Sequence, residues 1–348
     1  MIKVVNLIVL HKHKNSKFLY YVKSLIMYCT PKFICKIQLK RILSRLLEYG
    51  SKDIYDRVNY YNRLEHFAIS NDIVLPLGFK FKKKGDIVPK AKRTFISLSM
   101  FTYNKIWGSA YFFDTYRYTR YFADSFKMAF RFGDVTDVTI AAIVKSRPVS
   151  DDNANSVVLN LDKSHHFVFL KDKKPFESKK NKLIGRGGVY QPHRIEFFKK
   201  YFNHPLCDLG ALNYDKNFPQ WKMGKVSIDY HLNYKFILCL EGNDVASNLK
   251  WAMSSNSLAV MPRPKYETWF MEGRLMPNYH YVEIKSDYSN LEEQLNYYIK
   301  HTDKALKIIE NAHRWVEQFS DKKKEDLISV LTVQKYFTKT GQMDLEWK

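Results

Sequence analysis

The spacing of apolar residues divides the chain into stretches with different periods. Residues 17–49 place apolar side chains at roughly helical spacing, with basic residues between them. From about 95 to 180, short β-branched or aromatic runs are separated by polar turns, a pattern typical of strands. Beyond residue 183, strand-like and helix-like runs alternate, which predicts a parallel sheet with crossover helices. The pattern as a whole predicts an α/β protein with a helical N-terminal segment.

The N-terminal helices are predicted to be amphipathic and basic. Thr30 before Pro31 suits a helix start, and Gly50 suits a helix stop. The apolar positions of this stretch are Ile34, Ile37, Leu39, Ile42, Leu43, Leu46 and Leu47, and the basic ones between them are Lys36, Lys40, Arg41 and Arg45. A basic amphipathic helix with aromatic neighbours suits an anionic membrane surface. The alternative is that these helices only cover the first domain.

The remaining runs give expected element bounds. Strands are expected at 138–144, 157–161, 167–170, 234–240, 257–261 and 281–285, and helices at 245–253, at 265–271 and from Leu291. Residues 171–182, dense in lysine, are predicted to be a surface connector beside a domain boundary. At 348 residues the chain is long enough for two domains.

The charge is strongly positive and unevenly placed. Lys and Arg outnumber Asp and Glu by 57 to 35, a net charge of +22, which points to an anionic partner. Residues 1–50 hold ten basic residues against Glu48, and residues 80–93 hold seven against Asp86. Nucleic acid is one possible partner, but no helix-turn-helix, zinc finger or RNA-binding aromatic motif is recognisable.

The cysteines and the first apolar run indicate in which cellular compartment the protein is expected. The four cysteines have neither metal-ligand spacing nor the density of a disulfide scaffold, so a reducing cytoplasm is expected. The apolar run at residues 4–10 is too short to span a bilayer and no small-residue cleavage site follows it. We therefore expect neither translocation nor a transmembrane helix.

The most informative stretch is residues 234–256, where a buried strand is followed by a tight turn and a helix. In an open parallel sheet, ligands bind beyond the carboxyl ends of the strands, and a helix N-terminus there attracts phosphate. The candidate diphosphate-binding residues of this turn and helix are Glu241, Gly242, Asn243, Ser247, Asn248 and Lys250. Such a turn is also common in α/β proteins that bind nothing there.

Two further clusters are candidates for the same role. Arg186, Gly187 and Arg194 combine closely spaced glycines with always-charged donors that can surround an anion. Glu267, after the expected strand at 257–261, is placed to accept hydrogen bonds from ribose hydroxyls. The alternatives are a structural turn for the first cluster and a helix cap for Glu267.

The sequence lacks the motifs of several kinds of enzyme. No two aspartates have the Asp-x-Asp spacing with which many transferases hold a cation, so no metal and no cofactor are expected. A metal-free reaction would use Lys, Arg and the helix dipole to offset the charge on a departing diphosphate. The sequence also lacks a nucleophilic-elbow serine, a zinc spacing and a P-loop.

The motifs and their order resemble a known enzyme family. Residues 241–299, EGNDVASNLKWAMSSNSLAVMPRPKYETWFMEGRLMPNYHYVEIKSDYSNLEEQLNYYI, and residues 184–198, IGRGGVYQPHRIEFF, resemble the family 90 glycosyltransferases. The similarity is greatest to bacterial lipopolysaccharide and lipooligosaccharide core enzymes and more distant to eukaryotic protein O-glucosyltransferases and fungal capsule proteins. It covers about residues 135–320.

The resemblance implies a GT-B architecture, in which two Rossmann-like domains face a central crevice. The implied division is a basic helical segment at 1–55, an acceptor-binding domain at 56–180, a nucleotide-sugar-binding domain at 181–322 and a helix crossing back at 323–348. The candidate for that helix is residues 324–338.

The resemblance also implies an inverting, metal-independent displacement in which a carboxylate deprotonates the acceptor hydroxyl. Where eukaryotic members have an arginine in the diphosphate helix this chain has Asn248, so the phosphate charge is assigned to Arg186, Arg194 or Lys250. Where they place the catalytic aspartate this chain has Ser146. The nearby carboxylates are Asp134, Asp137, Asp151 and Asp152, of which Asp137 is favoured because it precedes the strand expected at 138–144.

The function expected from the sequence is hexose transfer, from UDP-glucose or UDP-galactose, to the inner core of lipopolysaccharide or lipooligosaccharide. The enzyme is expected to be cytoplasmic and peripheral on the inner membrane, held at its anionic surface by the basic N-terminal region. Two alternatives stay open: a non-catalytic family member that binds UDP-sugar, and a nucleic-acid-binding protein.

Overall fold

The computed structural model describes residues 16–67, 69, 96–100 and 109–345, except 135, 137 and 151. These residues form two compact units. The first contains residues 165–265 and 271–320, and the second contains residues 16–164, 266–270 and the C-terminal residues from 321. The apolar run at 4–10 and the lysine cluster at 80–93 lie outside the described residues.

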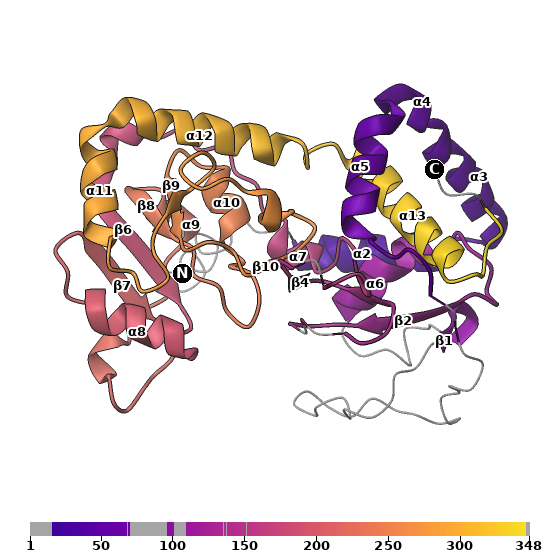
Figure 1. Ribbon diagram of the computed structural model, residues 1–348, viewed down its shortest axis with the longest axis horizontal. Coiled ribbons are helices and arrows are strands. Elements are labelled where there is room, and N and C mark those ends of the chain that lie inside the picture. The colour runs from indigo at the N-terminus through magenta and orange to yellow at the C-terminus, as the bar shows by residue number, and fades with distance from the viewer. Residues whose placement is uncertain are drawn as a thin grey trace. The chain divides into compact units, whose positions relative to one another are not determined.

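The first unit is built on a five-stranded parallel sheet, as the alternating pattern predicted (Figure 1). Its strands are β6 (Lys180–Gly187), β7 (Cys207–Ala211), β8 (Tyr234–Leu238), β9 (Leu258–Met261) and β11 (Val282–Glu283). The order is β11-β9-β8-β6-β7, so the chain leaves β7 and returns on the other side of β6. In this doubly wound order the chain adds β7 on one side of β6 and then adds β8, β9 and β11 on the other side. The strand order therefore switches between β6 and β8, which is where such sheets bind ligands.

Helices and short turns connect these strands. They are the 3₁₀ turns Phe176–Ser178, Pro219–Trp221 and Glu272–Arg274, and the helices α8 (Pro192–Tyr201), α9 (Ile228–His231), α10 (Leu249–Met253), α11 (Leu291–Lys300) and α12 (Thr302–Glu317). Buried residues of β6, β7, β8, β9, β11, α8, α11 and α12 form one continuous apolar core. The central strands β8 and β9 are buried along their whole length, which explains why their sequences are apolar except for Lys235.

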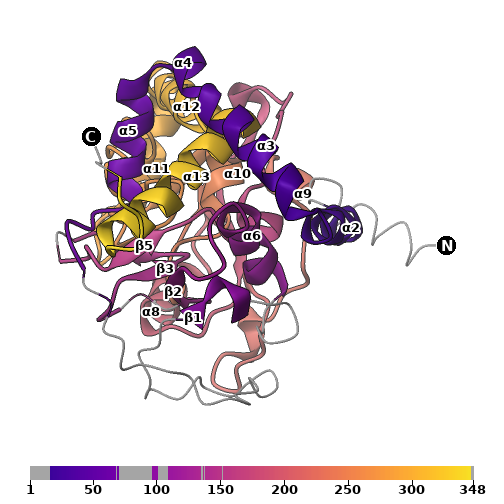
Figure 2. The same cartoon turned by 90° about the vertical axis from the view of Figure 1, so that its right-hand side faces the viewer.

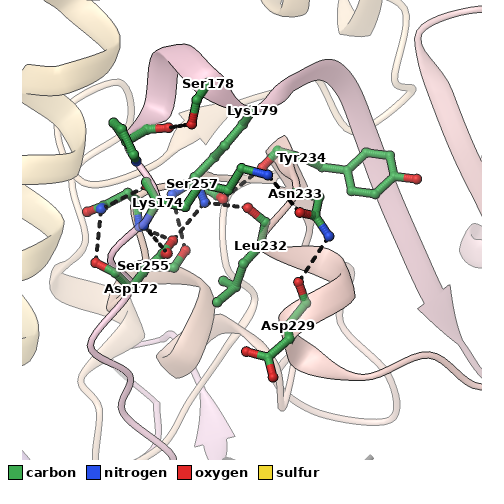
Figure 3. A network of polar contacts seen from close by, with 12 residues as sticks. Asp172, Lys174, Ser178, Lys179, Asp229, Leu232, Asn233, Tyr234, Ser255 and Ser257 are labelled. Carbon is green, nitrogen blue, oxygen red and sulfur yellow. Dashed lines mark hydrogen bonds and ion pairs between the residues drawn. The ribbon is translucent and has the colours of Figure 1, made fainter. Parts of the chain in front are cut away.

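The amino-terminal edge of this sheet is fastened by buried polar contacts (Figure 3). Lys179, 4% exposed, donates to Asp172 Oδ2 at 2.7 Å and to the Leu232 carbonyl at 2.6 Å. Lys174 donates to Asn233 at 2.7 Å, just before β8. The prediction that residues 171–182 form a surface connector is confirmed in part: Lys171, Lys173, Lys180 and Lys182 are exposed, but Lys174 and Lys179 are paired and the end of the segment enters β6. The two compact units divide between residues 164 and 165, before this segment.

The second unit combines N-terminal and C-terminal elements (Figure 2). Its sheet has the order β1-β2-β3-β5, with β2, β3 and β5 parallel and β1 antiparallel. The strands are β1 (Ile96–Ser97), β2 (Lys127–Arg131), β3 (Ala142–Val144) and β5 (Ser156–Val158). The helices are α2 (Lys17–Tyr28), α3 (Lys32–Ser44), α4 (Leu46–Tyr49), α5 (Ser51–Tyr61), the 3₁₀ turn Leu98–Met100, α6 (Ser109–Thr119), α7 (Lys163–His166) and α13 (Lys322–Lys339). Helix α6 packs against both α2 and α13.

The predicted N-terminal helices are present with small differences at their ends. Helix α3 is capped by Pro31 rather than Thr30, whose hydroxyl instead donates to the Ile26 carbonyl of the preceding helix. Gly50 ends α4 with φ of 75°, as its freedom from a side chain allows. No helix within the described part of the chain is both long and apolar enough to cross a membrane.

Two predicted elements are wrong. Residues 167–170, expected to be a strand, have no regular structure, and the Leu170 N–H donates to the Ser254 hydroxyl instead of a strand. Residues 265–271, expected to be a helix, contain the short strand β10 (Tyr266–Glu267), which pairs antiparallel with β4 (Arg147–Pro148). Tertiary contacts explain why residues 265–271 are not helical, because Trp269 stacks on Tyr61 with ring centres 3.7 Å apart.

Candidate donor site

The loops after β6 and β8 meet at the carboxyl edge of the first unit's sheet, and Arg194 joins them. Its Nη1 donates to the Gly188 carbonyl at 2.7 Å, after β6. Its Nη2 and Nε donate to the carbonyls of Leu240 and Glu241 at 2.7 and 2.8 Å, after β8. All three guanidinium nitrogens are therefore used to hold the point at which the strand order reverses.

Arg194 brings to this edge a positive charge that has no ion-pair partner in the described part of the chain. Among the described residues no Asp or Glu forms an ion pair with Arg194, whose acceptors are neutral carbonyls. Burial lowers the pKa of Arg194, but an arginine stays protonated at neutral pH. Arg194 and His193 also lie in the first turn of α8, which has no acidic residue there. Basic residues at the positive end of a helix dipole are unfavourable unless an anion is bound nearby.

The turn after β8 is more extended than the sequence predicted. Helix α10 begins at Leu249 rather than near 245, so the residues before it form a loop. Gly242 lies beside Arg194: a Cβ placed on it would be 3.5 Å from Nη2. Asn248 donates to the Leu238 carbonyl at 2.9 Å and so fastens the loop to the end of β8. The exposed side chains of Asn243 and Ser247 face solvent.

Glu241 and two neighbouring side chains complete the loop. The Glu241 carboxylate accepts from the Lys265 N–H at 2.9 Å, which links the loops after β8 and β9. His193 lies 2.9 Å from the Glu241 carbonyl, and Gln191 donates to Asn243 at 3.1 Å. His193 and Gln191 were not among the predicted site residues. The sequence could have indicated them, because they flank Pro192, which is the first residue of the helix that follows β6.

Lys250 and Arg186 are committed to ion pairs inside the unit. Lys250 is fully buried and its Nζ lies 2.7 Å from Glu272 Oε1, which is also buried. Arg186 bonds the carboxylate of Asp208 on β7, to which Tyr234 also donates. Burial alone would raise the pKa of Asp208, but these two hydrogen bonds outweigh it and lower that pKa. Gly187, the last residue of β6, accepts from the Leu212 N–H at 2.8 Å.

Glu267 lies in the second unit, in a buried ion pair. Its Oε1 is 2.7 Å from Nε of Arg147, and neither side chain is more than 1% exposed. The remaining Arg147 nitrogens donate to the carbonyls of Tyr60, Tyr61 and Ser156. Glu267 thus neutralises a buried arginine and fastens β10 to β4.

We expect Glu267→Ala to lower the free energy of unfolding by about 3–5 kcal/mol, because Arg147 would remain buried without a counter-charge. Glu283→Ala, which removes the exposed ion pair with Arg263, is the matched control and should cost about 0–1 kcal/mol. Denaturant unfolding measures both. A Glu267 variant of native stability that had lost nucleotide-sugar binding would instead assign this residue to the donor.

The predicted catalytic base, Asp137, lies outside the described residues, as does Asp151. Ser146 is fully buried after β3. Asp134 follows β2, is 44% exposed and forms an ion pair with Lys145, which follows β3. The carboxyl ends of these two parallel strands therefore present a half-exposed carboxylate. Asp152 is exposed.

In the described part of the chain, no three His, Cys, Asp or Glu side chains are grouped so that they could hold a metal ion.

Comparison with known proteins adds two findings. Residues 165–334 match the sequence family described as glycosyl transferase family 90. The chain is also 42% identical over 231 residues to the O-glucosyltransferase LpsA of Dichelobacter nodosus, an alignment that covers 66% of this chain and 73% of that protein. The family match spans the whole first unit, including the loops joined by Arg194, and extends into α13.

Proposed function

Since this chain belongs to glycosyl transferase family 90, as its motifs indicated, we propose that it transfers a hexose from a UDP-sugar to the inner core of a lipopolysaccharide or lipooligosaccharide. The observation that carries the donor assignment is the uncompensated charge of Arg194 between the ends of β6 and β8. A diphosphate supplies the anion that this arrangement lacks. The name of the related O-glucosyltransferase favours UDP-glucose over UDP-galactose.

In the proposed reaction the acceptor oxygen attacks the anomeric carbon, the bond to the diphosphate breaks, and UDP leaves with the electron pair. Inversion follows from attack on the face opposite the leaving group. Arg194 and the N-terminus of α8 stabilise the charge that develops on the diphosphate. A carboxylate takes the hydroxyl proton. Asp137 is the base inferred from the sequence, and Asp134 is a second candidate because it is half exposed at the end of β2.

We propose a two-domain GT-B arrangement with the donor on the first unit and the acceptor on the second. Each unit contains parallel strands of the kind found in Rossmann-like domains. The match to family 90 and the parallel sheets support this arrangement.

The proposed location is the cytoplasmic face of the inner membrane. Helix α2 supports this with an exposed apolar face made of Phe18, Leu19, Val22, Leu25 and Ile26, which recur at helical spacing. Exposed Lys17 and Lys23 flank that face, and Phe33 and Ile37 continue the exposed apolar surface on α3. Apolar side chains bordered by lysines suit an anionic lipid surface.

The test is transfer of radiolabelled hexose from a panel of UDP-sugars to truncated core lipooligosaccharide, in the presence of EDTA. We expect one donor, UDP-glucose, to be used, and EDTA to have no effect. Asp137→Asn and Asp134→Asn should show which of the two residues is the base, because loss of the base should lower the transfer rate by about 10²–10⁴-fold. UDP binding without transfer from any donor would favour a non-catalytic family member. Absence of UDP binding would remove the proposed function.

A further inference from the structure

A cavity lies wholly within the second unit, away from the donor loops in sequence. It has a volume of about 360 Å³ and is lined by side chains of α2, α3, α6, α7 and α13, and of the segment that follows α6. Helices α2, α3, α6 and α13 are grouped together in Figure 2. Its volume is in the range of small-molecule sites, which is roughly 300–1,000 Å³. Tyr20, Ser24 and Met27 line it from the side of α2 that faces away from the exposed apolar residues, and Lys23 lies at the border between the two sides.

The cavity contains a buried arginine without a counter-charge. Arg120 is only 5% exposed, and its Nη1 donates to the Met27 carbonyl at 2.7 Å while its Nη2 donates to the side-chain oxygen of Gln38. Among the described residues no carboxylate pairs with Arg120. Its Nε is buried and has no hydrogen-bond partner. Buried polar groups are normally paired, and a buried charge is costly unless it is neutralised. Arg120 therefore indicates a missing anionic partner.

The other charged side chains of the cavity do not neutralise the positive charge of Arg120. Arg117 and Asp326 form a bidentate pair at 3.1 and 3.0 Å and cancel one another. Lys163 and Asp114 also carry opposite charges, and the Lys163 N–H donates to the Asp114 carboxylate at 3.1 Å. Lys23, which is exposed at the rim, adds a further positive charge to that of Arg120. The lining thus carries about two positive charges more than negative ones.

The rest of the lining suits a polyhydroxylated ring. Phe113, Tyr118 and Tyr121 contribute aromatic rings, which pack against apolar C–H surfaces. The Asp114 carboxylate and the Ser24 hydroxyl offer acceptors for hydroxyl groups. An inorganic ion would use the charge but leave the aromatic wall and much of the volume unused.

We propose that this cavity binds a sugar that carries one phosphate or carboxylate group, and that this sugar is part of the acceptor. The anionic group neutralises Arg120 and Lys23, and the ring lies against the aromatic wall. The acceptor assignment rests on the proposed function, whereas binding of an anionic sugar does not.

The probe is glucose 6-phosphate, with glucose and inorganic phosphate as comparisons, titrated by calorimetry into the full chain. We expect glucose 6-phosphate to bind more tightly than either comparison. Lys23→Ala should weaken its binding by about tenfold, because a charge-assisted hydrogen bond is lost. Lys17→Ala, an exposed lysine of the same helix that does not line the cavity, should leave binding unchanged. Arg120→Gln tests the buried charge directly. If the Arg120→Gln protein does not fold, the Lys23→Ala result still tests the site.

Competition then separates the acceptor from an independent effector. Glucose 6-phosphate should inhibit transfer competitively with the acceptor, and removal of phosphate and carboxylate groups from the acceptor should raise its KM without changing the KM for the donor. Binding that does not compete with the acceptor overturns the acceptor assignment. No binding of glucose 6-phosphate, or equal binding by the Lys23→Ala variant, overturns the site itself. UDP binding measured in parallel reports on the proposed function separately.

Discussion

Replacing Arg194 by glutamine is expected to lower kcat/KM for the nucleotide sugar by about 10²–10³-fold, the usual cost of losing one preorganised donor at a site of developing charge. The variant loses the positive charge and the three hydrogen bonds that join the loops after β6 and β8. Arg194→Lys should recover only part of the activity, because one ammonium restores the charge but not the planar fork. Initial rates and calorimetric UDP binding measure the two effects.

Arg263→Gln is the matched control. Arg263 also follows a strand of the same sheet, but its side chain is exposed and its ion pair with Glu283 is at the surface. We expect its kcat/KM to stay near that of the wild type. Circular dichroism must show that the Arg194 variants are folded, because the same bonds support the loops. A folded Arg194→Gln protein with native UDP affinity would show that the diphosphate binds elsewhere.

Replacing three residues of the apolar face of α2 is expected to release the protein from membranes. Phe18, Leu25 and Ile26 are 75%, 56% and 66% exposed, so their change to serine removes little packing from the folded protein. Each apolar side chain contributes about 1.5–3 kcal/mol when it leaves water. Loss of all three should therefore reduce partitioning to anionic vesicles by on the order of 10³-fold.

Vesicle sedimentation of the full chain, at low and high salt, measures this change. The control replaces Tyr214, Leu306 and Met223, exposed apolar side chains of the first unit, by serine. Wild-type binding should also weaken with salt, because the basic residues of α2 and α3 contribute an electrostatic part. Native binding by the α2 variant would contradict the membrane-surface assignment, whatever the transferase activity.

The sequence alone determined the α/β class and the family, and it located the loops at the carboxyl edge of the first unit's sheet. The runs at β8 and β9, apolar except for Lys235, predict buried parallel strands because both faces of such a strand are covered. The turn after β8 and the arginine segment before α8 were recognisable because a carboxyl-edge loop and a helix start have local signatures. Gly50 likewise ends its helix through its own backbone freedom.

The tertiary structure decided which of the charged residues are available. Arg194, Lys250, Arg186 and Glu267 look equally suitable in the sequence, yet Lys250, Arg186 and Glu267 are paired with Glu272, Asp208 and Arg147, which lie 22, 22 and 120 residues away. Of these four, Arg194 alone has only neutral acceptors and no ion-pair partner among the described residues, so its charge is the one that we assign to the ligand. Arg120 likewise has no carboxylate partner among the described residues: it lies 5.0 Å from the centre of the Tyr121 ring and donates to α2 and α3, which only the packing of these helices beside the end of α6 shows. Local sequence encodes strands, turns and caps, whereas the balance of buried charge depends on partners that are distant along the chain.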